Sequence, residues 1–161
     1  PPGRRPPDAR PVAVFEDGRV EAGVSTRSLI YFVSAEEGVH RVWSFSPRTN
    51  RLTELPLGFQ ARVMALTPVG QSDSVTFSAE GWTKPRGWYR ATAGQAKLRI
   101  AEPGTSTSDY DDVVVTRDYA TAADGVRIPI TLIARKDVRH PAPLWASVYG
   151  AYGFTISPYF K

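Results

Sequence analysis

Short apolar segments recur along the first two thirds of the chain, each rich in β-branched and aromatic residues and each followed by turn residues. They start at regular intervals, close to the spacing of about 8 to 12 residues that is typical of an all-β meander. No amphipathic helix of useful length is predicted before residue 100. The predicted strands cover residues 29–33, 42–45, 52–55, 63–66, 75–77, 88–91 and 98–100.

A β-sandwich and a β-propeller both fit such a meander. A propeller blade consists of four antiparallel strands, so the predicted strands make somewhat under two blades. That number cannot close a ring, and unclosed blades leave unpaired strand edges. We therefore expect a missing partner or a missing remainder of the chain.

The pattern changes after Glu102-Pro103-Gly104, where the polar segment 105–109 predicts a linker. Longer strand-like runs then flank Asp124-Gly125, and this dipeptide between two such runs predicts a β-hairpin. Alternate residues from Val126 to Leu132 place apolar side chains on one face of the return strand. Pro129 cannot donate a ladder hydrogen bond, so this strand is expected near a sheet edge or at a bulge.

The segment Leu144–Tyr149 is almost wholly apolar. A short, continuous apolar run is typical of a parallel strand that is buried on both faces. It continues into Gly150-Ala151-Tyr152-Gly153, which would be a loop at the carboxyl end of that strand. Sites in α/β sheets form at this end, so the loop is the most promising place for functional residues.

Composition changes this picture at the N-terminus. The chain is 42% hydrophobic and 22% charged, which is ordinary for a globular protein. Prolines cluster with Arg4 and Arg5 near the start, so residues 1–27 are predicted to be a linker or a ragged end. Because the first residue is Pro1 rather than Met, we expect the chain to begin inside a longer protein.

Charge and residue types exclude several classes of function. The net charge is +4, but the basic residues form no stripe, so no nucleic-acid partner is predicted. The chain has no cysteine, which excludes disulfides and thiolate metal sites and fits a reducing, cytoplasmic location. No apolar run is long enough to span a membrane and no signal peptide precedes the strands. No ligand spacing indicates a metal and no Gly-rich loop a phosphate, so no cofactor is predicted.

Residues from about 28 to 160 resemble the prolyl oligopeptidase and oligopeptidase B family of serine peptidases. Individually the motifs are short, and their order and spacing make the resemblance specific. Three stretches carry it: Thr83-Lys84-Pro85-Arg86-Gly87-Trp88-Tyr89, Asp124-Gly125-Val126-Arg127-Ile128-Pro129, and Pro143-Leu144 followed by Val148-Tyr149-Gly150-Ala151-Tyr152-Gly153.

The resemblance implies a mostly β fold in this chain. Residues 28–104 would form the last blades of a β-propeller, and residues 105–161 a linker and the first strands of an α/β-hydrolase domain. Family members hydrolyse short peptides with a Ser-Asp-His triad and without a cofactor, some after proline and others after basic residues. The partners implied are short peptide substrates and the remainder of the propeller and catalytic domain.

This sequence departs from the family pattern in one respect that matters. The nucleophile elbow of the hydrolase fold is Gly-x-Ser-x-Gly, and no such pentapeptide occurs here. The triad would lie beyond Lys161, so the chain alone is predicted to be inactive. His40 and His140 are predicted to be surface or turn histidines rather than substitutes for the triad member.

Tyr149 is the strongest candidate for a catalytic role. The resemblance implies that a tyrosine hydroxyl in this loop donates to the oxyanion formed in acyl transfer. An ungapped alignment from Pro143 places that tyrosine at Tyr149, whereas an alignment backwards from Phe154 places it at Tyr152. Phe154 is a candidate for lining the pocket of the residue before the scissile bond. Ordinary packing at a strand end is the alternative for each aromatic residue.

A second class of function is also open. The chain could be a non-catalytic, all-β binding or interaction domain that resembles a propeller by convergence. Such a domain would not need an apolar strand that ends in a Tyr-Gly-x-x-Gly loop, so the C-terminal third favours the peptidase.

Overall fold

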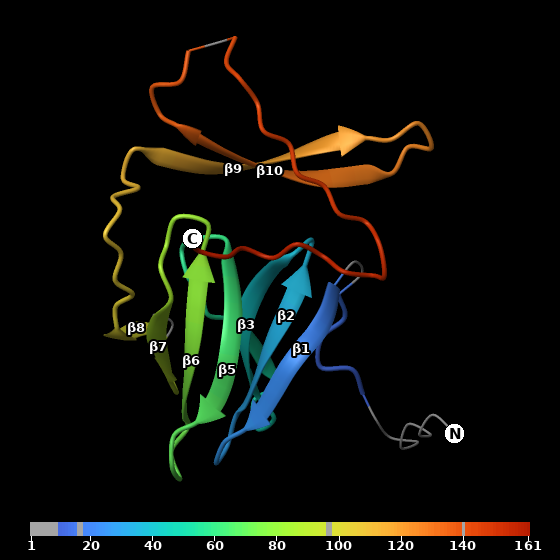
Figure 1. Cartoon of the computed structure of the whole chain (residues 1–161). Coiled ribbons are helices and arrows are strands. Elements are labelled where there is room, and N and C mark those ends of the chain that lie inside the picture. The colour runs from blue at the N-terminus through green and yellow to red at the C-terminus, as the bar shows by residue number, and fades with distance from the viewer. Residues whose placement is uncertain (1–9, 16–17, 96–97, 140) are drawn as a thin grey trace.

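The computed structural model describes residues 10–15, 18–95, 98–139 and 141–161. In these residues all regular structure is β, and no helix is present. Figure 1 shows a twisted array of strands, with a separate hairpin that lies across one end of it.

Strands β1 to β8 form two antiparallel meanders of four strands each. Their order is sequential, and the described strands of the two meanders are paired at a single point, between His40 and Ala61. Four-stranded meanders of this kind are the blades of a β-propeller. The first blade contains β1 (Gly18–Ser25), β2 (Ile30–Glu36), β3 (Val39–Ser46) and β4 (Arg51–Glu54). The second contains β5 (Ala61–Pro68), β6 (Ser74–Gly81), β7 (Gly87–Thr92) and β8 (Arg99–Glu102).

Each predicted strand of the meander coincides with an observed one, but one strand was missed. β1 lies inside residues 1–27, for which the prediction of a linker or ragged end is therefore wrong in part. The strand has two glycines and is mostly exposed, so its own residues favour a strand only weakly. Its partner decides the matter, because β1 pairs along the whole edge of β2. The Pro-rich cluster at residues 1–7 lies outside the described residues.

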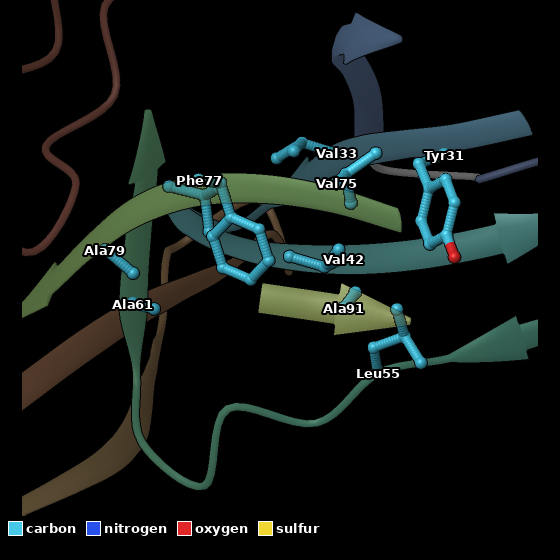
Figure 2. Close-up of a cluster of buried hydrophobic side chains, with 10 residues drawn as sticks. Tyr31, Val33, Val42, Leu55, Ala61, Val75, Phe77, Ala79 and Ala91 are labelled. Carbon is cyan, nitrogen blue, oxygen red and sulfur yellow. The ribbon is translucent and has the colours of Figure 1, made fainter. Parts of the chain in front are cut away.

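An apolar layer lies between the two blades. Val33 and Val42 from the first blade meet Val75 and Phe77 from the second, and each is at least nine-tenths buried (Figure 2). Such side chains each contribute roughly 1.5–3 kcal/mol to folding. The blades therefore share one core, which neither could cover alone.

Polar contacts join the blades at both ends of this layer. The backbone N–H of Val63 donates to His40 Nδ1 at 3.2 Å. At the other end Asp73 accepts hydrogen bonds from the Thr26 hydroxyl at 2.8 Å and the Ser28 amide at 2.6 Å. The hydrogen bonds from Ser28 and Thr26 hold the pKa of Asp73 below its ordinary value.

His40 is consequently not the surface or turn histidine that the sequence predicted. It lies within β3, is only partly exposed and bonds the neighbouring blade. Burial lowers its pKa, helped by the charges of Arg62 and Arg19 and opposed by that of Glu21. His140 lies outside the described residues.

The predicted hairpin is present as β9 (Val113–Thr121) and β10 (Arg127–Arg135). Gly125 has a φ of +87°, the left-handed conformation that makes glycine favourable in the connecting turn. Pro129 pairs with Tyr119 in a sheet of two strands, so it lies at an edge, as predicted.

The predicted buried strand at Leu144–Tyr149 is absent. This segment pairs with no other strand in the part of the chain that the structure describes. Leu144 and Trp145 are 82% and 91% exposed, so neither has the buried position that a strand covered on both faces would give it. An apolar sequence can only favour a strand, because the ladder bonds and the covering layers come from other segments.

The position of His40 predicts a pH-dependent stability. Its lowered pKa means that the unfolded chain takes up a proton more readily than the folded one. The contribution of neutral His40 to the free energy of unfolding is therefore fully present above the ordinary pKa of 6.5, and it is lost as the pH falls below that value. Thermal melts between about pH 8 and pH 5 should show a falling midpoint.

The matched control is His40→Gln, which keeps an acceptor for the Val63 amide but does not titrate. We expect a flatter pH profile for this variant. Identical profiles for the two proteins would contradict the role of His40.

Candidate functional site

The candidate loop makes a tight turn from Ala151 to Phe154. The Phe154 amide donates to the Ala151 carbonyl at 3.1 Å, which closes the turn. Tyr152 and Gly153 have φ values of +57° and +64°, the pattern of a type I′ turn. Glycine adopts this conformation freely, whereas a tyrosine in it is uncommon and strained.

The two candidate tyrosines differ in their contacts and in their exposure. The turn brings the Tyr149 and Phe154 rings together edge to face, with centroids 5.6 Å apart and an interplanar angle of 87°. Tyr149 is 51% exposed, while Tyr152 is 98% exposed at the tip of the turn. The structure thus brings together Tyr149 and Phe154 and leaves Tyr152 apart from them.

A phenol group can donate a hydrogen bond to a developing negative charge, but it cannot by itself supply a nucleophile or a base. His40 is bonded to the second blade and is therefore engaged elsewhere. In the described residues no cluster of His, Cys, Asp or Glu is arranged to hold a metal ion. No helix there is long and apolar enough to cross a membrane.

Sequence reasoning missed a polar cluster that joins the turn between β2 and β3 to strand β9. Arg117 Nη2 donates to the Glu37 carbonyl at 2.5 Å and to its Oε2 at 3.1 Å, and the Tyr119 hydroxyl donates to the same Oε2 at 2.9 Å. Arg117 and Tyr119 are two residues apart, so they share one face of β9. Their shared face could be predicted from this spacing, but nothing in the sequence linked them to Glu37, some eighty positions away.

The C-terminal segment is a further feature that the sequence did not reveal. It returns from the hairpin along the ends of the blades (Figure 1). Pro158 is almost completely buried, and the Tyr159 ring packs on Trp82 at 5.4 Å. The residues directly after the candidate loop are therefore anchored to the blades.

The fold defines the class of protein first: two propeller blades that lead through a hairpin into an extended segment. Oligopeptidase B from Trypanosoma brucei superposes on 91% of this chain with a TM-score of 0.68 and 21% identity. Prolyl oligopeptidase B from Galerina marginata covers 78% of it with a TM-score of 0.64 and 15% identity. The chain spans only 23% and 18% of those two structures.

Curated relatives agree with the structures. The uncharacterized peptidase y4qF of Sinorhizobium fredii is 32% identical over 56% of this chain, and dipeptidyl aminopeptidase BI of Pseudoxanthomonas mexicana is 32% identical over 61%. The chain spans 12% and 14% of these two proteins. No protein-family model matches it. The predicted resemblance to the prolyl oligopeptidase and oligopeptidase B family is thus confirmed.

The exposed apolar segment predicts self-association of the chain on its own. Leu144, Trp145 and Val148 are each more than four-fifths exposed and lie close together in sequence. Apolar surface of this kind drives association in water. Size-exclusion chromatography with light scattering should show a mass that rises with concentration.

The variant Leu144→Ser/Trp145→Ser should shift the chain towards the monomer, because it removes two of these side chains. A control with Arg48→Ser, on the exposed β3–β4 turn, should not. A monomer at every concentration would contradict the prediction.

Proposed function

We propose that this chain is part of a serine endopeptidase of the prolyl oligopeptidase type, which hydrolyses short peptides. In this proposal residues 105–161 are the linker and the beginning of an α/β-hydrolase domain, and the Ser-Asp-His triad lies elsewhere in a longer protein. The observation that carries it is the superposition of 91% of the chain, blades and C-terminal part together, on one oligopeptidase B. Relatives that are peptidases support the same reading.

The proposal assigns Tyr149 as one donor of the oxyanion hole, with a backbone N–H beside the nucleophile as the other. The edge-to-face contact with Phe154 supports Tyr149 over Tyr152, because an oxyanion donor must be held in place before the reaction. Phe154 is proposed to line the pocket for the residue before the scissile bond. Neither role needs a cofactor.

Peptides are the proposed substrates. The prolyl oligopeptidase B of Galerina marginata was solved with a bound 35-residue substrate, which supports this class of ligand. A propeller beside the site would limit access to short or flexible chains. The absence of cysteine supports a reducing, cytoplasmic location as part of the proposal.

Replacing Tyr149 with Phe in the longer peptidase should lower kcat and leave KM nearly unchanged. The hydroxyl would bond a charge that exists only in the transition state, so its loss removes differential binding. Removal of one oxyanion donor costs about 10² to 10³ in kcat. Steady-state kinetics on a short chromogenic peptide would measure the effect.

Tyr152→Phe is the matched control, since the alternative alignment puts the large effect there. A kcat for Tyr149→Phe within about threefold of wild type, equivalent to ~0.7 kcal/mol, would show that the oxyanion assignment is wrong.

The 161-residue chain alone should hydrolyse no peptide. It contains no Gly-x-Ser-x-Gly elbow, and a single oxyanion donor without a nucleophile gives no acyl transfer. Assays on peptides that contain proline or arginine should stay at background, with the longer peptidase as the positive control. Turnover that co-purifies with the chain through several steps would refute this expectation.

A further inference from the structure

The turn between β2 and β3 has an unusual backbone. Both of its central residues are left-handed, with φ of +50° at Glu37 and +83° at Gly38. A glutamate in this conformation is strained, and such strain persists only where the surroundings hold it. The turn contacts both the β9–β10 hairpin, which precedes the candidate loop in sequence, and the C-terminal segment, which follows it.

On the upstream side the turn holds the β9–β10 hairpin. Arg117 contributes two hydrogen bonds to Glu37, one to the backbone carbonyl and one to the carboxylate. The Arg117 side chain is only 21% exposed, and its other terminal nitrogen donates to Thr131 in β10 at 3.0 Å. Both strands of the hairpin are therefore linked to the Glu37 side of the turn.

On the downstream side the turn touches the chain that follows the loop. A Cβ on residue 38 would lie 2.5 Å from the Ile156 carbonyl oxygen and 3.1 Å from Thr155 Cγ2. The backbone of the C-terminal segment therefore packs where only a glycine fits. Burial of Pro158 and the contact of Tyr159 with Trp82 continue this anchoring.

One turn thus contacts the chain on both sides of the exposed stretch 141–154, whose own residues make few contacts with the blades. We propose that the Glu37-Gly38 turn is a positioning element for the loop that carries Tyr149 and Phe154. The role in catalysis rests on the proposed function, whereas the anchoring itself does not. A displacement of about 1 Å at a reacting group can cost about 10²-fold in rate, so a blade residue can control the reaction from a distance.

The first experiment measures the position of the loop in the 161-residue chain. Because the chain has no cysteine, the double variant Thr49→Cys/Ala151→Cys takes up spin labels at these two positions and nowhere else. Both residues are exposed. Distances between the labels are measured by pulsed electron paramagnetic resonance, with an excess of unlabelled chain. Gly38→Ala should broaden the distance distribution at least about twofold, because the added Cβ displaces the C-terminal segment.

Gly58→Ala is the control for backbone strain. Gly58 has a φ of +81°, nearly that of Gly38, but a Cβ there would meet nothing within 4 Å. The width should stay at the wild-type value in this variant. If Gly38→Ala does not fold, Tyr159→Ala loosens the same segment from the Trp82 side and should broaden the distribution too.

The second experiment uses kinetics in the longer peptidase. Gly38→Ala should lower kcat by about tenfold or more with little change in KM, and it should have no further effect in a Tyr149→Phe background. If the role of Gly38 were purely structural, Gly38→Ala would instead lower kcat by the same factor in the wild-type and the Tyr149→Phe background. Distance distributions of equal width for Gly38→Ala, Tyr159→Ala and Gly58→Ala would overturn the proposal. Broadening combined with a silent Tyr149→Phe would support the anchoring and overturn only the oxyanion assignment.

Discussion

Burial of the apolar layer between the two blades is the interaction on which the rest of the structure depends. Each blade is a small antiparallel sheet, and a sheet with one uncovered apolar face is barely stable in water. Val33 and Val42 of the first blade pack against Val75 and Phe77 of the second. The apolar faces of the two blades are therefore buried against each other. The ends of the strands, and every turn that contacts the C-terminal segment, take their positions from this layer.

Apolar burial has no direction, so the layer alone would allow the blades to slide. The hydrogen bonds at its two ends are directional and restrict that freedom. His40 bonds the edge of β5 on one side, and Asp73 bonds the β1–β2 turn on the other. The layer supplies most of the free energy, and these polar contacts select one arrangement of the blades.

The relation between blade and loop follows from that arrangement. With the blades fixed, the Glu37-Gly38 turn projects from the end of the first blade, where it meets Arg117 and the backbone at Ile156. The loop between these contacts is exposed and contacts mainly itself, through Tyr149 and Phe154. Its residues are therefore presented at the end of a packed β-sheet scaffold, a common arrangement for functional loops.

The sequence by itself determined the features that depend on neighbouring residues. The strands of the meander and the turn at Asp124-Gly125 follow from local periodicity and turn chemistry, and the candidate Tyr149 followed from a motif. Tertiary structure alone decided which edges meet. β1 became a strand because β2 offered a partner, whereas the more apolar 144–149 did not because no strand lies beside it in the described residues. Contacts such as that of Glu37 with Arg117 join residues far apart in the chain. A local sequence pattern carries no information about which distant residue will be the contact partner.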